Sequence, residues 1–121
     1  EQLITASADG AYSVYATDVN GDGFVDILVA SYLDDKVRLF LNDGETSSPS
    51  FTEQLITASA DGARSVYATD VNGDGTVDIL VASLSDDKVR LFLNDPYPTF
   101  SPTPFPSPLP QFIPSSNLFV K

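Results

Sequence analysis

Two acidic loops of identical spacing occur in this chain, 52 residues apart. Each nine-residue loop has oxygen-bearing side chains at positions 1, 3, 5 and 9, and glycine at positions 4 and 6. Hard cations such as Ca²⁺ are bound by carboxylate, carboxamide and main-chain carbonyl oxygens, and residue 7 would contribute its carbonyl. The spacing predicts about two Ca²⁺ per chain, with Asp18, Asn20, Asp22, Phe24 and Asp26 as the first set of ligands and Asp70, Asn72, Asp74, Thr76 and Asp78 as the second.

Other metal sites and a metal-free turn share part of this sequence pattern. An EF-hand opens with the same spacing but requires a bidentate Glu at position 12 and flanking helices. Position 12 is Val29 in the first loop and Val81 in the second, and strand-like residues flank both loops, which excludes the EF-hand. Mg²⁺ fits less well because it prefers strict octahedral geometry and retains several waters. A glycine-rich hairpin turn with surface acids and no ion is the remaining alternative.

Composition excludes several classes of function. The formal net charge of −11 argues against binding to nucleic acid or to an anionic membrane surface. No apolar run approaches the roughly 18 residues of a membrane-spanning helix, so no membrane insertion is expected. The chain has no Cys and no His, which excludes disulfides, thiolate chemistry and His-based catalysis. The paired acids Asp34-Asp35 and Asp86-Asp87 resemble exposed hairpin turns, and we predict that the chain is not an enzyme.

The loops belong to two nearly identical repeats. Residues 1–43 and 53–95 match at 39 of 43 positions, and the four differences indicate positions where packing does not dictate identity. The sequence predicts a first repeat over 1–52, a second over 53–95 and a proline-rich, extended tail over 96–121. The differing pairs are Tyr12/Arg64, Phe24/Thr76, Tyr32/Leu84 and Leu33/Ser85.

The segments around the loops are typical of strands. They are β-branched, apolar or alternating, and turn signals separate them. Strands are expected over 13–17, 25–31, 36–41 and 51–57, with the equivalent segments in the second repeat. Four strands in meander order form one blade, so we predict an all-β fold of two four-stranded antiparallel β-propeller blades. Residues 1–6 are expected to form a further outer strand, whereas the last blade lacks one of its own.

Two blades alone leave apolar sheet faces uncovered, because each repeat buries its faces only against its neighbours. We therefore expect part of a larger or oligomeric ring, completed by missing blades or by other copies of the chain. Three chains would supply six blades, and four chains would supply eight.

The segment from Ser13 to Ser31 resembles the core of FG-GAP/VCBS repeats, as in integrin α-subunit propellers and many secreted microbial proteins. The resemblance implies a calcium-binding β-propeller with one ion in each loop between the inner and second strands. It also implies an extracellular, secreted or cell-surface location and a role as a scaffold for adhesion or protein–protein interaction. The alternative is a carbohydrate-binding, lectin-like propeller in which Tyr12, Tyr15 and Tyr67 stack on a sugar ring. The sequence does not identify the protein or glycan ligand.

Overall fold

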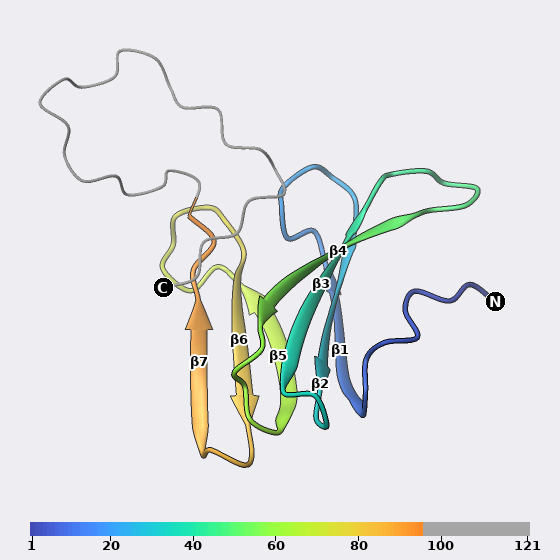
Figure 1. Ribbon diagram of the computed structural model, residues 1–121. Coiled ribbons are helices and arrows are strands. Elements are labelled where there is room, and N and C mark those ends of the chain that lie inside the picture. Colours follow the sequence, from blue (N-terminus) through green and yellow to red (C-terminus); the bar gives the residue numbers. More distant parts are fainter. Residues whose placement is uncertain (96–121) are drawn as a thin grey trace, which may run out of the picture.

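Seven antiparallel strands form two sheets in the computed structural model, which describes residues 1–95 (Figure 1). The first sheet has the order β1-β2-β3-β4 and the second β5-β6-β7. The all-β prediction is confirmed, and none of the described residues forms a helix that could cross a membrane. The predicted tail over 96–121 lies outside the described residues. The strands are β1 Ala11–Thr17, β2 Asp26–Ser31, β3 Lys36–Asn42, β4 Phe51–Thr57, β5 Ala63–Thr69, β6 Asp78–Ser83 and β7 Lys88–Phe92.

Strand β4 crosses the boundary between the two sequence repeats and completes the first sheet. It pairs with β3 in a register that places Gln54 opposite Leu39. Within residues 1–95 the second sheet has three strands, as expected for a last blade without its own outer strand.

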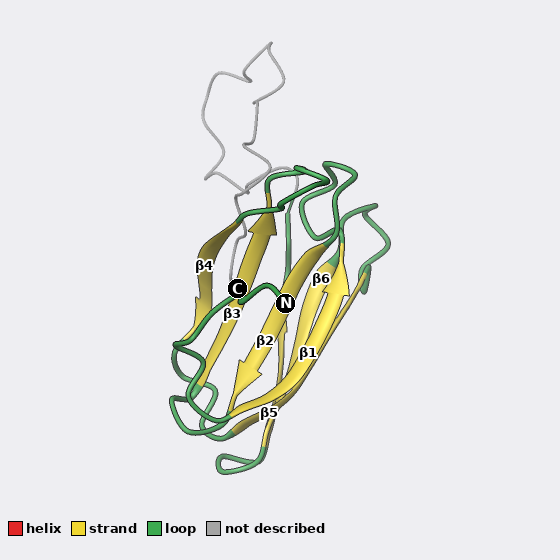
Figure 2. Ribbon diagram, turned by 90° about the vertical axis from the view of Figure 1, so that its right-hand side faces the viewer, coloured by secondary structure: helices red, strands yellow, loops and turns green. Residues whose placement is uncertain are grey.

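The expected strand over residues 1–6 is not formed, and this part of the prediction was wrong. The same sequence pairs with β3 at residues 53–57, and that edge of β3 is therefore already occupied by β4. The N-terminal segment instead lies over the outer face of the first sheet (Figure 2), where the Gln2 side-chain amide donates to the carbonyl of Pro49.

The core lies between the two sheets. Alternate residues of a strand point to opposite faces, so each sheet presents two different apolar faces. The inner face of the first sheet packs against the second sheet, and β5 contacts β1, β2 and β3. Together these faces form one hydrophobic cluster that includes Leu28, Ala30, Val37 and Leu39 from the first sheet and Val66, Ala68, Ile79 and Val81 from the second.

Identical residues of the two repeats have opposite environments. Val37 is 0% exposed, whereas its counterpart Val89 is 76% exposed. Conversely, Val66 is 4% exposed, whereas its counterpart Val14 is 67% exposed. The contact between the sheets therefore joins the face of the first repeat that carries Val37 to the face of the second repeat that carries Val66. The opposite faces, which carry Val14 in the first repeat and Val89 in the second, remain open.

Candidate metal centre

The first acidic loop wraps around the carboxylate of Asp18, the residue directly after β1. This carboxylate accepts hydrogen bonds from the backbone N–H groups of Gly21 and Gly23 at 2.9 and 2.8 Å, and from that of Asp22 at 3.2 Å. Both glycines have positive φ, 77° and 89°, a conformation in which a side chain would be strained. The loop therefore folds around the carboxylate of its first acid.

Asp26, the first residue of β2, closes the loop from the protein interior. Its carboxylate is 0% exposed and accepts from the backbone N–H of Val19 at 2.8 Å and of Asn42 at 2.9 Å. Burial raises the pKa of Asp26, the two N–H groups act in the opposite direction, and the charge of Asp22 raises it further. A bound cation would relieve the cost of this buried negative charge.

The three acids of each loop converge on one point. One carboxylate oxygen from each of Asp18, Asp22 and Asp26 lies within 4.8 Å of the others. Ligands on opposite sides of a Ca²⁺ ion are about 5 Å apart, because each Ca–O distance is about 2.3–2.6 Å. Arg38 and Arg90 form ion pairs with acids outside the loops. The cluster thus has the charge, ligand type and spacing to bind a metal ion.

The second loop repeats this geometry. Asp70 accepts from Gly73 at 2.8 Å and Gly75 at 2.9 Å, and the fully buried Asp78 accepts from Val71 and Asn94, both at 2.9 Å. The carboxylate oxygens of Asp70, Asp74 and Asp78 also lie within 4.8 Å of one another.

Position 7 is where the loops differ. The Thr76 hydroxyl donates to Asp74 at 2.6 Å, and this bond lowers the pKa of the Asp74 carboxyl. Phe24, the equivalent residue, instead packs its ring beside Gly44. Both backbone N–H groups donate at 2.9 Å to the acid at position 5, Asp22 in the first loop and Asp74 in the second. The loop backbone is therefore the same although the side chains differ. The remaining predicted ligands, Asn20 and Asn72, accept from these same position-5 residues at 3.2 and 3.3 Å.

Asn42 and Asn94 support the loops, and sequence analysis missed them. Besides their backbone bonds to the buried acids, the Asn42 side chain donates to the carbonyl of Val25 and the Asn94 side chain to that of Val19, both at 2.9 Å. The second bond joins the second repeat to the first loop. The sequence signal for them is an Asn 16 residues after the last acid of each loop.

The paired acids after β2 form a turn, as predicted. Asp34 accepts from Arg38 and from the Ser31 hydroxyl, both at 2.5 Å, while Asp35 adopts a positive φ of 60°. Burial tends to raise the pKa of Asp34, but the bonds from Arg38 and Ser31 outweigh it and lower the pKa. These contacts give the pair a structural role.

The tyrosines considered for sugar stacking lie where the repeats meet. The rings of Tyr15 and Tyr67 are 4.7 Å apart between centroids. The Arg64 guanidinium lies 4.7 Å from the Tyr12 ring and 5.1 Å from the Tyr32 ring. Positions 12/64 and 32/84, which differ between the repeats, thus contribute Arg64, Tyr12 and Tyr32 to a direct cation–π contact. The expectation that packing does not dictate identity at these positions was wrong for these three side chains.

The packed four- and three-stranded sheets and their duplicated acidic loops define a repeat module of the β-propeller type. The sequence pattern of the FG-GAP-like repeat matches residues 18–81, from the start of the first acidic loop through the second to β6. The chain belongs to this family of repeats, and the resemblance stated from the sequence is confirmed. Comparisons with curated proteins and with solved structures found no match.

Proposed function

We propose that each acidic loop binds one Ca²⁺ and that the chain is a calcium-stabilised β-propeller module. It would serve as an extracellular scaffold for adhesion or protein–protein interaction. The observation that carries this proposal is the convergence of three carboxylates in each loop, one of them fully buried at the start of a strand. A buried carboxylate beside two others is costly even with its backbone hydrogen bonds, and a divalent cation offsets that cost.

In the first loop, Asp18, Asp22 and Asp26 would hold the ion, assisted by the Asn20 side chain and the Phe24 carbonyl. The equivalent residues of the second loop would hold the other ion. The positive charge of Ca²⁺ would hold together the carboxylates that follow one strand and begin the next. Selective binding to the folded state adds about 2.7 kcal/mol of stability per site when free Ca²⁺ is 100 times the dissociation constant.

The extracellular location and the scaffold role have separate support. Millimolar Ca²⁺ outside cells saturates loops of modest affinity. The open sheet faces of both repeats, marked by Val14 and Val89, offer apolar surface for a protein partner. The lack of Cys and His supports a role other than catalysis. The carbohydrate-binding alternative has less support, because Tyr15 and Tyr67 pack on each other between the repeats.

Isothermal titration with Ca²⁺ tests the metal proposal. Asp22→Asn and Asp74→Asn each remove one charged ligand from an exposed position but keep an oxygen that can accept the nearby N–H. We expect two sites in the unmodified chain and a loss of affinity of at least about tenfold at one site in each variant. Asp61→Asn, which removes an exposed acid outside the loops, should leave both sites unchanged. Absence of Ca²⁺ binding, or equal binding by all these proteins, would contradict the proposal.

A further inference from the structure

Strand β7, at the edge of the second sheet, has an equivalent strand in the first repeat that is paired on both sides. Strand β7, Lys88–Phe92, has the same sequence as residues 36–40 of β3. Strand β3 lies between β2 and β4, whereas β7 has β6 on one side and no further strand of the described residues on the other. An exposed edge of this kind presents unpaired backbone groups to a strand from another molecule.

The strand that would fit this edge is present at the start of the chain. Residues 1–5 have the same sequence as residues 53–57, which form most of β4 and pair with β3. In the structure, residues 1–5 form no strand. Within the described residues, the outer edge of β7 has no partner strand and residues 1–5 form no strand, although the same two sequences pair as β3 and β4.

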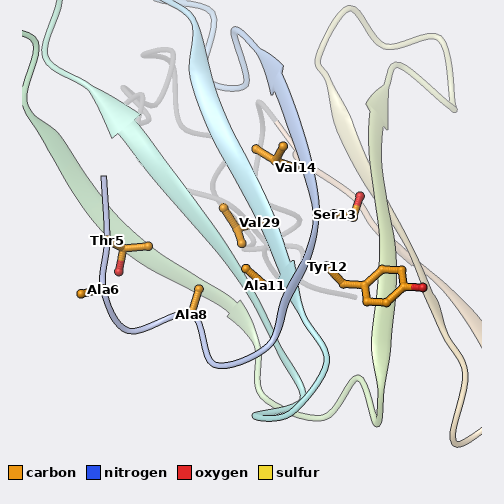
Figure 3. Close-up of a pocket in the computed structure, with 8 residues that line it drawn as sticks. All are labelled: Thr5, Ala6, Ala8, Ala11, Tyr12, Ser13, Val14 and Val29. Carbon is orange, nitrogen blue, oxygen red and sulfur yellow. The ribbon is translucent and has the colours of Figure 1, made fainter. Parts of the chain in front are cut away.

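Geometry separates these two elements within one chain. The N-terminal segment lies beside β1 at one end of the stack of sheets, and β7 lies at the opposite end (Figure 1). The segment covers part of the outer face of the first sheet and leaves a groove of about 380 Å³ (Figure 3). Its lining includes Ala8 of the segment and Tyr12 and Val14 of the sheet.

We propose that residues 1–5 of one copy of the chain add to β7 of a second copy as an antiparallel fourth strand. The second sheet of the copy that accepts the strand then covers the outer face of the first sheet of the copy that donates it. This inference rests on the β-propeller part of the proposed function. The β3–β4 register, transferred to the new pair, places Gln2 opposite Leu91 and Leu3 opposite Arg90. Glu1 then lies opposite Phe92 and near Arg90, as Glu53 lies 3.6 Å from Arg38.

The contact between the sheets of one chain is the template for this interface. The Asp35 side chain accepts a hydrogen bond from the backbone N–H of Gly62 at 2.8 Å, and the Asp35 backbone carbonyl accepts one from the N–H of Ala60 at 3.1 Å. The Ser13 hydroxyl accepts from the N–H of Val66 at 3.3 Å. In the new interface the same residue types face one another: Asp87 and Ser65 of one copy, and Ala8, Gly10 and Val14 of the other.

Backbone conformation and charge also support a contact of this kind between two copies. Asp87 and Gly10 have φ of 56° and 65°, close to the 60° of Asp35 and the 67° of Gly62. Arg64 of one copy would face Tyr12 of the other, which preserves a cation–π pair. Because the two surfaces differ, the contact is head-to-tail and closes into a ring when the rotation permits.

Engineered disulfides test this pairing cleanly, because the chain has no cysteine. We mix a tagged Gln2→Cys variant with an untagged Leu91→Cys variant in Ca²⁺, oxidise the mixture, and measure the mixed covalent dimer. Leu3→Cys replaces Gln2→Cys in the matched control, because a shift of one residue moves the thiol to the other face. The Leu39→Cys/Gln54→Cys variant forms the same pair within one chain and reports the yield that this geometry allows.

We expect the mixed dimer from Gln2→Cys and Leu91→Cys to exceed that from the Leu3→Cys control at least about tenfold. Equal yields from the two mixtures would overturn the proposal. Sedimentation in the same buffer should show oligomers of the unmodified chain and monomers after removal of residues 1–6, and a monomer in both cases would also overturn it. Cross-linking without Ca²⁺ binding would refute the metal proposal alone, and Ca²⁺ binding without cross-linking would refute only strand donation.

Discussion

Truncation of the same valine in each repeat should have very different effects on stability. Val37→Ala removes two methyl groups from a side chain that is 0% exposed, whereas Val89→Ala removes them from one that is 76% exposed. Burial of each methyl group is worth about 0.8 kcal/mol, so Val37→Ala costs about 1.6 kcal/mol plus a cavity term, or about 2 kcal/mol in all. Only a quarter of Val89 is covered, so its truncation should cost about 0.4 kcal/mol.

Urea unfolding at concentrations where the chain is monomeric measures this difference. We expect the midpoint of Val37→Ala to fall well below that of Val89→Ala, with the slope of both transitions unchanged. Equal losses in the monomer would refute the assignment of buried and open faces to the two repeats. At concentrations that favour assembly, the cost of Val89→Ala should rise toward that of Val37→Ala, because strand donation buries Val89.

Two further predictions concern side-chain pairs outside the loops. The hydrogen bond from Arg90 holds the pKa of Asp86 at about 2, below its ordinary 3.8, so the pair stabilises the fold above about pH 4 and loses this effect as the pH falls toward 2. Asp86→Asn should flatten the dependence of unfolding free energy on pH in this window, and an unchanged pH profile would contradict the assignment. A double-mutant cycle of Arg64→Ala with Tyr32→Leu, which introduces the residue of the second repeat, should give a coupling of about 0.5–1 kcal/mol. Strict additivity in thermal or urea unfolding would show that the cation–π contact does not contribute.

Local sequence determines most of the secondary structure. Strands expected over 13–17, 36–41 and 51–57 are found at Ala11–Thr17, Lys36–Asn42 and Phe51–Thr57. The β-branched and alternating residues carry this information within each segment. The backbone of the acidic loops was equally predictable, because every proposed ligand lies within nine consecutive residues and the glycines adopt positive φ.

Contacts between distant segments were not predictable in the same way. Residues 1–5 and 53–57 have one sequence, yet only the second forms a strand, because only it lies beside the complementary strand β3. Likewise, Asn94 reaches the carbonyl of Val19, and Arg64 reaches Tyr12 and Tyr32, only after the two sheets have packed. These contacts depend on tertiary arrangement, which a single sequence reveals only through weak signals such as a repeated Asn.

Native mass spectrometry in the presence and absence of a calcium chelator is the most direct test of the central claim, that each acidic loop holds one Ca²⁺. We predict two Ca²⁺ for each chain, lost on chelation, and one for each chain of the Asp74→Asn variant at limiting Ca²⁺. A folded chain whose mass is the same with and without the chelator would contradict the claim.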